Sequence, residues 1–220
     1  MLQCRHVNER KVTPEILDEL PPDDPEAIRS RRDLRLVNAL MDNYRWIARQ
    51  MADFGDGVEP WFELGAGDGE LARHLQKPPV TGIDLAPRPT GWPEDWAWEQ
   101  GDLFETFPAL AGGTDSCGVV ANLFLHHFEN PGLARLGELF SESARVLIVS
   151  EPARFWLHRI QGYATTPFVN RVTHHDLHVS IEAGFRAGEL PEIMGLGGNF
   201  DIVEESRTFF GSYRLVAVRK

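Results

Sequence analysis

The sequence predicts a doubly wound α/β fold with a mostly parallel seven-stranded sheet, an antiparallel last strand and a helical N-terminal lid. From about residue 60 onward, short apolar runs alternate with helical patterns, which is typical of parallel strands covered on both faces. The last two runs are separated only by Gly211 and Ser212, so we expect them to pair antiparallel. Before residue 60, residues 1–25 are polar and end in an extended stretch, and residues 26–53 show a helical pattern.

The strands are expected at 61–64, 80–84, 98–100, 117–122, 146–149, 201–210 and 213–219. Helices are expected where apolar residues recur every three or four positions, at 26–53, 70–76, 131–143, 153–162 and 173–184. The proline-rich residues 20–25 exclude helix, and the segment 86–96, rich in proline and tryptophan, is expected as loop. Residues 1–55 are therefore assigned to an N-terminal extension and helical lid, and 56–220 to the α/β domain.

Composition excludes several classes of protein. The formal net charge of −11 disfavours a nucleic-acid partner, and the four arginines within 29–35 lie among acidic residues. The two cysteines form neither a disulfide framework nor a zinc site. No apolar run reaches the roughly 18 residues of a membrane span, and the first residues lack the apolar stretch of a signal peptide. We therefore expect a cytoplasmic protein without a membrane span.

A glycine-rich segment, Glu63–Gly69, joins the first strand of the domain to its helix, and its three glycines let the backbone turn sharply against a ligand. A dinucleotide fingerprint needs a further glycine where this sequence has Glu70. A carboxylate there has the wrong sign for a pyrophosphate. Together with Glu63, it favours a cationic ligand, such as the sulfonium and amino group of S-adenosylmethionine (SAM). A dehydrogenase-like or unrelated α/β domain is the alternative.

Polar residues also follow the next three strands. Asp84 ends the second strand, where its two oxygens match the two hydroxyls of a ribose. Asp102 follows the third strand, at a position that borders the adenine in this fold. Asn122 ends the fourth strand, beside the crevice in which open α/β sheets bind ligands.

Taken together, these segments resemble the ordered motifs of the class I SAM-dependent methyltransferases over roughly residues 60–220. The segments that carry the resemblance are Glu63–Gly69, Gly82–Leu85, Gly101–Leu103 and Ala121–His127. It implies a Rossmann-like methyltransferase domain over 56–220, with SAM as cofactor and S-adenosylhomocysteine (SAH) as product. The cofactor-binding residues that it implies are Glu63, Gly65, Ala66, Gly67, Asp84, Leu85, Asp102, Leu103 and Asn122.

A narrower resemblance concerns residues 29–38, 172–177 and 183–185. These segments are similar to bacterial methyltransferases associated with type III polyketide synthases. That resemblance implies small phenolic or lipid-like acceptors.

Two adjacent histidines are the catalytic candidates. Methyl transfer is an in-line displacement that needs a base only when the acceptor loses a proton. His126 and His127 follow the fourth strand, where such motifs lie beside the transferred methyl group in the family. Either imidazole is suited to orient or deprotonate a hydroxyl, because it titrates near neutral pH. The alternative is that both pack or cap the junction between strand and helix.

A second histidine group lies within Thr173–His178. His174 and His178 are four residues apart on one helix face, which permits a metal ion, but no third ligand is identifiable and no metal is predicted. Thr173 and Asp176 instead predict a capping pair at a helix start. His174 is predicted to contact the substrate, because the family's segment between strands five and six often lines the acceptor pocket.

The N-terminal helix is expected to act as a lid. Its polar residues Asn38, Asn43 and Tyr44 are predicted to contact the substrate, although a solvated helix face is the alternative. The histidines favour a small-molecule acceptor methylated at oxygen. A protein or other macromolecule as acceptor, and a non-catalytic SAM-binding partner module, are the alternative functions. The sequence indicates no oligomeric state.

Overall fold

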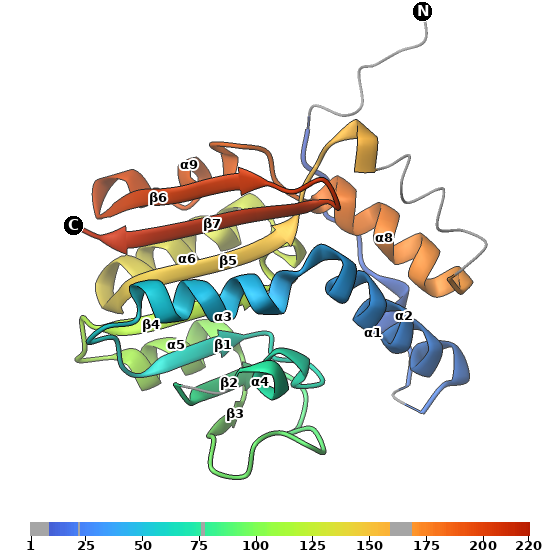
Figure 1. Cartoon of the computed structure of the whole chain (residues 1–220), viewed down its shortest axis with the longest axis horizontal. Coiled ribbons are helices and arrows are strands. Elements are labelled where there is room, and N and C mark those ends of the chain that lie inside the picture. The colour runs from blue at the N-terminus through green and yellow to red at the C-terminus, as the bar shows by residue number, and fades with distance from the viewer. Residues whose placement is uncertain (1–8, 22, 76–77, 159–168) are drawn as a thin grey trace, which may run out of the picture.

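The computed structural model of the chain describes residues 9–21, 23–75, 78–158 and 169–220. Its centre is a seven-stranded sheet in the order β3-β2-β1-β4-β5-β7-β6 (Figure 1). The strands are β1 (Trp61–Leu64), β2 (Val80–Asp84), β3 (Trp98–Gln100), β4 (Cys117–Asn122), β5 (Ala144–Pro152), β6 (Phe200–Arg207) and β7 (Ser212–Arg219). Strand β7 pairs antiparallel with both β5 and β6, and the other pairs are parallel. The predicted fold class is confirmed.

Helices cover both faces of the sheet. They are α1 (Ile16–Glu19), α2 (Pro25–Met41), α3 (Asn43–Phe54), α4 (Glu70–His74), α5 (Leu103–Ala111), α6 (Asn130–Ser143), α8 (Arg171–Ala183) and α9 (Glu189–Ile193), with short 3₁₀ turns η2 (Leu125–His127) and η3 (Leu196–Gly198). The α3 and α4 helices pack on one face, and α5, α6 and α9 on the other. Across the described ranges, no helix is both long enough and apolar enough to cross a bilayer.

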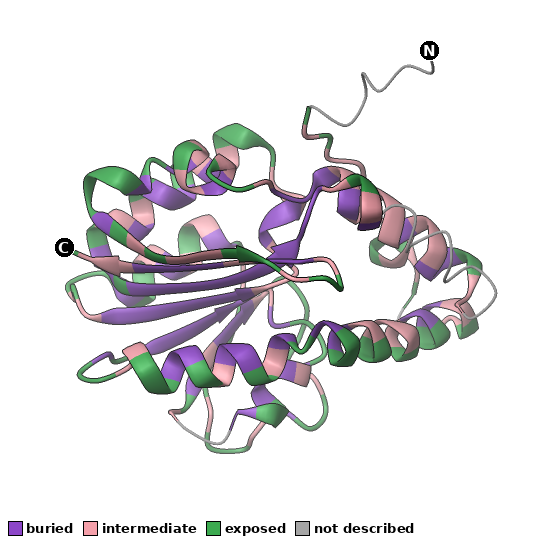
Figure 2. Ribbon diagram, turned by 45° about the horizontal axis from the view of Figure 1, so that its top comes forward, coloured by how far each residue is buried: buried purple, intermediate pink, exposed green. Residues whose placement is uncertain are grey.

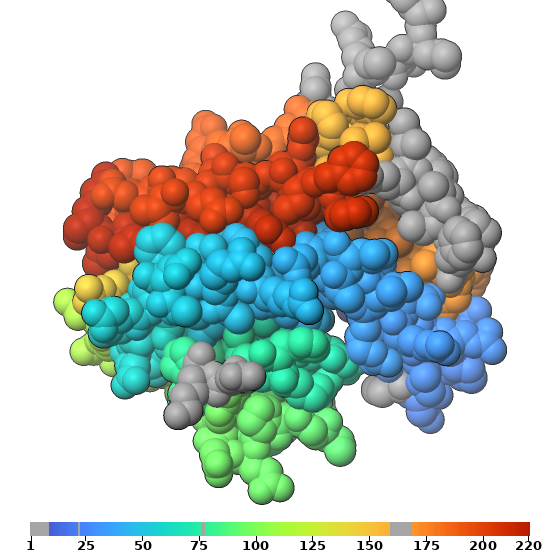
Figure 3. All heavy atoms as spheres, in the orientation of Figure 1, coloured from blue at the N-terminus to red at the C-terminus, as the bar shows by residue number. Residues whose placement is uncertain are grey.

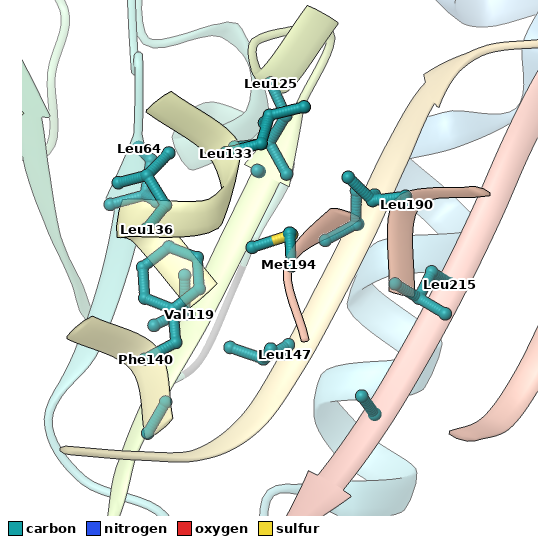
Figure 4. Close-up of a cluster of buried hydrophobic side chains, with 14 of the residues drawn as sticks. Leu64, Val119, Leu125, Leu133, Leu136, Phe140, Leu147, Leu190, Met194 and Leu215 are labelled. Atoms are coloured by element: carbon teal, nitrogen blue, oxygen red, sulfur yellow. The ribbon is translucent and has the colours of Figure 1, made fainter. Parts of the chain in front are cut away.

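Neighbouring strand residues feed two separate hydrophobic clusters, because successive side chains point to opposite faces of a sheet. Val119 packs with Phe140 and Leu147 in the larger cluster (Figure 4). Val120, the next residue of β4, packs with Ile47 of α3 and Trp61 on the other face. The central strands β1, β4 and β5 are almost entirely buried, whereas the edge strands β3 and β6 are largely exposed or half-buried (Figure 2). The loops at their carboxyl ends are therefore carried on a rigid base.

A single helix over 26–53 is wrong. Asp42 adopts the left-handed conformation, with φ 55° and ψ 32°, and ends α2 at the point where α3 begins. Arg214 from β7 donates to the carbonyls of Met41 at 2.8 Å and Asp42 at 3.3 Å. The break lets α3 lie flat on the sheet while α2 runs beyond it towards α8 (Figure 1). An apolar repeat continues across such a break, so the sequence pattern did not reveal it.

Three further differences concern element bounds. The α5 helix, which contains Pro108, was not expected. The sixth strand ends at Arg207, not at 210, and Phe209 and Phe210 are exposed in the turn that follows. The helix expected over 153–162 lies partly outside the described residues, which stop at 158 and resume at 169.

Candidate functional site

The glycine turn after β1 is built around positive φ angles at Gly65 (60°), Gly67 (50°) and Gly69 (71°). A Cβ on Gly65 would lie 2.0 Å from the Phe124 ring, so this position has no room for a side chain. At Gly67 an added Cβ would meet nothing closer than 3.9 Å. The turn therefore presents bare backbone to an open space in front of Gly67.

Glu63, at the end of β1, is a buried acid beside this turn. Its side chain is 4% exposed, and one of its carboxylate oxygens has no hydrogen-bond partner although it is buried. Burial and the nearby charge of Asp84 raise the pKa of Glu63 to about 8. A buried acceptor without a partner is costly to the fold. A positively charged donor in the space in front of the turn would complement this oxygen.

Asp84 joins the end of β2 to the glycine turn. One carboxylate oxygen accepts from the Gly67 N–H at 2.8 Å, and the other accepts from the Ala86 N–H at 2.8 Å. Each oxygen retains a further lone pair for ligand hydroxyls. Leu85 beside it is 76% exposed, which is unusual for a large apolar residue and suits contact with a flat ligand ring.

Three other predicted cofactor residues differ in what they offer. Asp102 is exposed and caps α5 by accepting from the Phe104 N–H at 2.8 Å. Leu103 and Ala66 have buried side chains that belong to the hydrophobic clusters. If Leu103 and Ala66 contact a cofactor as predicted, they do so through backbone atoms.

Asn122, at the end of β4, is tied to the lid by amide side chains. Its amide nitrogen donates to the Asn38 side-chain oxygen at 3.4 Å, and Asn43 donates to the same oxygen at 3.2 Å. The Asn43 oxygen in turn accepts from the Ser212 hydroxyl at 2.6 Å. Both ends of the fully buried Asn43 amide are thus used inside the protein. The Asn122 oxygen is buried without a partner, as is the Glu63 oxygen.

Tyr44 lies on the glycine-turn side of the site rather than beside the histidine pair. Its ring is 4.6 Å from the His74 ring. Burial and the charges of Glu70 and Glu63 raise the pKa of its hydroxyl. Tyr44 therefore stays protonated near neutral pH.

The α2 helix connects the glycine turn with α8. On one side, Arg31 and Arg35 reach Asp68 at 3.6 Å and Glu70 at 3.5 Å. On the other side, the Thr173 hydroxyl of α8 donates to the Ser30 hydroxyl at 2.9 Å. A notch remains open between the blue surface of α2 and the teal surface around the glycine turn (Figure 3).

His126 lies between two carboxylates. Its Nδ1 is 2.8 Å from Glu151 of β5, and its Nε2 is 3.3 Å from Glu15 of the N-terminal segment. Glu151 is fully buried and also accepts the backbone N–H groups of Phe124, Leu125 and His126 at 3.0, 2.8 and 3.3 Å. The β5 strand thereby fixes both the η2 turn and the orientation of the imidazole.

His127 lies next to His126, with 4.2 Å between the ring centroids. Its Nδ1 is 3.6 Å from a carboxylate oxygen of Asp18, and its side chain is 32% exposed. One oxygen of Glu15 and one ring nitrogen from each histidine lie within 4.8 Å of one another. The structure therefore brings the two predicted catalytic residues together with two N-terminal carboxylates.

The charges in this group follow from its geometry. Burial by itself would lower the pKa of His126, but its bonds to Glu15 and Glu151 raise it to about 9. Burial would raise the pKa of Glu15, but His126 holds it below its ordinary value. Burial and the His126 charge lower the pKa of His127, whereas burial and Glu15 raise that of Asp18 to about 6. His126 is thus the charged member of the histidine pair.

The N-terminal segment is held over the η2 turn by specific bonds. Arg10 donates to the carbonyls of His126 at 2.9 Å, Phe128 at 2.6 Å and Ala183 at 2.7 Å. The Ser180 hydroxyl of α8 donates to the carboxylate of Glu15. These contacts join the segment to both η2 and α8.

The predicted capping pair of Thr173 and Asp176 is wrong. Asn170 caps α8, since its side chain accepts from the Thr173 N–H at 2.8 Å. Asp176 instead caps α1, accepting from the N–H groups of Ile16 at 2.8 Å and Leu17 at 3.0 Å. The pairing failed because α8 begins two residues earlier, and a distant segment takes the carboxylate.

His174 lies on α8, with its ring centroid 4.7 Å from that of His178. The two histidines therefore pack against each other, as their spacing predicts. The contact of His174 with a substrate stays a prediction.

Sequence reasoning missed Arg10, Glu15 and Glu151. Glu151 lies near the end of a buried strand. A polar residue at a strand end is the same pattern that identified Asp84 and Asn122, so Glu151 could have been found from the sequence. Glu15 and Arg10 carried no such signal, because their partners are more than a hundred residues away in sequence.

Comparison with known proteins supports the fold. No protein-family model matches the chain, and no curated protein sequence matches it. Among solved structures, the plantazolicin methyltransferase BamL, in complex with a triazolic desmethylPZN analog and SAH, is similar with a TM-score of 0.64 and 10% identity over 92% of each chain. The magnesium protoporphyrin IX methyltransferase ChlM from Synechocystis PCC 6803, with bound SAH, has a TM-score of 0.58 and 17% identity, covering 90% of this chain and 91% of that one.

A third similar structure is the pyocyanin biosynthetic protein PhzM, with a TM-score of 0.58 and 16% identity. The match covers 90% of this chain and 60% of that protein. At these identities the likeness establishes architecture, so the chain has the Rossmann-like methyltransferase fold.

Proposed function

We propose that this protein is a SAM-dependent methyltransferase that transfers the methyl group to a small molecule, at oxygen. The observation that carries the proposal is the pair of buried, unpartnered oxygens on Glu63 and Asn122, at the ends of β1 and β4 beside a bare glycine turn. In a doubly wound sheet this edge is where ligands bind. Two acceptors without donors fit a ligand that carries positive charge and N–H groups.

Each residue of the glycine-turn side is proposed to contact a different part of SAM, the methyl donor. Glu63 would hold the positively charged amino-acid end, and Asp84 the ribose hydroxyls. Leu85 would cover one face of the adenine, and Asp102 would accept from its amino group. SAM supplies an electrophilic methyl group on a sulfonium. The residues named here bind and orient it, and they leave the exposed side of Asn122 and the histidine pair for the acceptor.

In the transfer itself, the acceptor oxygen forms a bond to the methyl carbon while the carbon–sulfur bond breaks. The bonding pair stays on sulfur, which becomes the thioether of SAH. The hydroxyl proton leaves to His127, the neutral imidazole of the pair, because His126 is already protonated. Alignment of the reacting oxygen contributes most of the acceleration, because this displacement needs no other covalent step. A phenolic or lipid-like hydroxyl, the class implied by the narrower sequence resemblance, is the first acceptor to examine.

Calorimetric titration with SAM and with NAD tests the donor assignment. We expect SAM and SAH to bind and NAD not to bind. Tighter binding of NAD, or binding of neither ligand, would contradict the proposal. Glu63→Gln keeps the size of the side chain but cannot ionise when the cation binds, so above about pH 8 it should weaken SAM binding at least about tenfold, the loss of one charge-assisted contact.

Transfer of radiolabelled methyl from SAM into a panel of phenols, carboxylic acids and proteins tests the acceptor. Labelling of a phenol at oxygen supports the proposal. Labelling of protein alone would overturn the assignment of a small molecule. Binding of SAM without any transfer would instead favour a non-catalytic binding module.

A further inference from the structure

The group formed by Glu15, His126 and His127 has the composition of a transition-metal site. We propose that these three side chains bind a divalent transition-metal ion such as Zn²⁺, beside the position expected for the acceptor hydroxyl. Its chemical role rests on the proposed function, but binding of the ion does not. Two imidazole nitrogens and one carboxylate oxygen suit Zn²⁺ or Co²⁺, whereas Mg²⁺ and Ca²⁺ prefer oxygen ligands throughout.

The spacing of the ligand atoms agrees with such an ion. In tetrahedral coordination with bonds of about 2.0–2.1 Å, two ligand atoms lie about 3.3 Å apart. The Oε1 of Glu15 and the Nε2 of His126 are 3.3 Å apart, which is long for a charge-assisted hydrogen bond. One ring nitrogen of His127 completes a set of three ligand atoms within 4.8 Å of one another. A small shift of the His127 ring, which is 32% exposed, would bring its nitrogen into coordination range.

Each ligand is oriented by a partner behind it. Glu151 holds the Nδ1 of His126 at 2.8 Å and turns Nε2 towards Glu15. Ser180 donates to the Glu15 carboxylate, and Asp18 lies 3.6 Å from the Nδ1 of His127. A carboxylate that fixes a ligating histidine from its far nitrogen is characteristic of protein metal sites.

The local charge also favours a cation. Glu15, Asp18, Glu151 and Asp176 surround the histidine pair, and the structure places Arg10 above the η2 turn with its guanidinium used by backbone carbonyls. A divalent ion would offset the excess of carboxylates, and its binding would release the proton of the His126 Nε2 to solvent.

Three protein ligands leave a fourth position open, as in catalytic rather than structural zinc sites. A hydroxyl oxygen bound at that position has its pKa lowered, because the metal acts as a Lewis acid. In the metal-bound protein the proton would pass to water instead of to the histidine pair, and both imidazoles would act as ligands. The site thereby selects acceptors whose hydroxyl can reach a metal ion.

Titration of the EDTA-treated protein with Co²⁺ in the absence of SAM tests the inference. We expect one Co²⁺ per chain with the visible absorption of tetrahedral cobalt, displaced by Zn²⁺. Glu15→Gln and His127→Ala should each weaken binding at least about a hundredfold, and Glu151→Gln about 10–100-fold. His74→Ala, an exposed histidine near the glycine turn, is the matched control and should leave binding unchanged.

Absence of Co²⁺ binding would overturn the inference and leave His126 as an imidazolium between two carboxylates. Equal binding by the wild type, Glu15→Gln and His127→Ala, or loss of binding in His74→Ala, would overturn it as well. Glu15→Gln keeps the size of the side chain and His127→Ala changes a partly exposed one, so both test the site even if His126→Ala does not fold. Calorimetry with SAM in EDTA separates the outcomes, since the donor site shares no residue with this cluster.

Discussion

The two ends of the site are constructed differently. The glycine-turn side draws its polar groups from strand ends and the turns that follow them, namely Glu63, Asp84 and Asn122. The histidine side combines η2 with Glu151 of β5, Glu15 and Asp18 of the N-terminal segment, and Ser180 of α8. One side is assembled along the sheet, and the other by segments that meet only in the folded chain.

This difference has a physical consequence. On the glycine-turn side, one side-chain oxygen of Glu63 and one of Asn122 have no hydrogen-bond partner in the protein. Both therefore remain available to accept hydrogen bonds from a ligand. On the histidine side, Glu151 accepts four hydrogen bonds and His126 uses both ring nitrogens. Substitutions on the first side should therefore change ligand binding, whereas substitutions deep on the second should change stability.

Glu151→Ala is expected to have the largest effect. It leaves three backbone N–H groups and a buried imidazole without their acceptor. The free energy of unfolding should fall by about 3–5 kcal/mol, the range for breaking a buried charged contact. Urea denaturation measures it, with Glu138→Ala on the exposed face of α6 as control, expected within about 0.5 kcal/mol. A loss below about 1 kcal/mol would remove the distinction between the two sides.

Asp84→Ala should have the next largest effect, and on binding rather than folding. Two hydrogen bonds between ribose hydroxyls and a carboxylate contribute about 1.5–3 kcal/mol each, so SAM affinity should fall at least about a hundredfold. Calorimetry measures the affinity, and thermal unfolding checks that the chain remains folded. Co²⁺ binding to the same variant should be unchanged. An unaltered affinity for SAM would exclude the ribose contact.

The sequence predicted residues at strand ends better than residues contributed by distant segments. The positions of Glu63, Asp84 and Asn122 were predicted because strand ends in a parallel sheet meet at one edge. His126 and His127 were found for the same reason, since they follow β4. Glu15 was not, because a polar residue in an N-terminal extension has no pattern that marks a partner 111 residues away.

The direction of the N-terminal helices was likewise not predictable from local sequence patterns. Apolar spacing predicted helix across 26–53 but not the break at Asp42. At that break, Arg214 of β7 donates to the carbonyls at the end of α2. A contact between residues so distant in sequence leaves no local periodicity, so the direction of α2 was not predictable.

The pH dependence of SAM binding should sharpen the contrast further. The pKa of Glu63 is raised from 4.5 to about 8, so the acid is protonated at neutral pH. A cation binds the ionised form, and affinity should therefore rise with pH, by up to about tenfold per unit, and level off above about 8. The same shift means that Glu63 lowers the stability of the free protein as the pH rises from 4.5 towards 8.

The measurement is the difference between the pH profiles of wild type and Glu63→Gln. This subtraction is needed because the donor has an amino group of its own that also titrates. The ordinary pKa of an α-amino group is about 7.7–8.0, close to that of Glu63. The glutamine variant should retain only the part contributed by the ligand. Parallel profiles for the two proteins would show that Glu63 does not face the cation.

Arg35→Ala should have the smallest effect, and it tests whether α2 merely covers the donor or holds it. Arg35 pairs with Glu70 at 3.5 Å, and its side chain is 47% exposed, so the pair contributes less than about 1 kcal/mol. SAM affinity should change less than about fivefold, and the change should shrink as salt is added. Arg45→Ala, a highly exposed arginine on α3, is the matched control. A loss above tenfold, seen only in Arg35→Ala and insensitive to salt, would mean that α2 contacts the donor directly, and the donor side would then also depend on a distant segment.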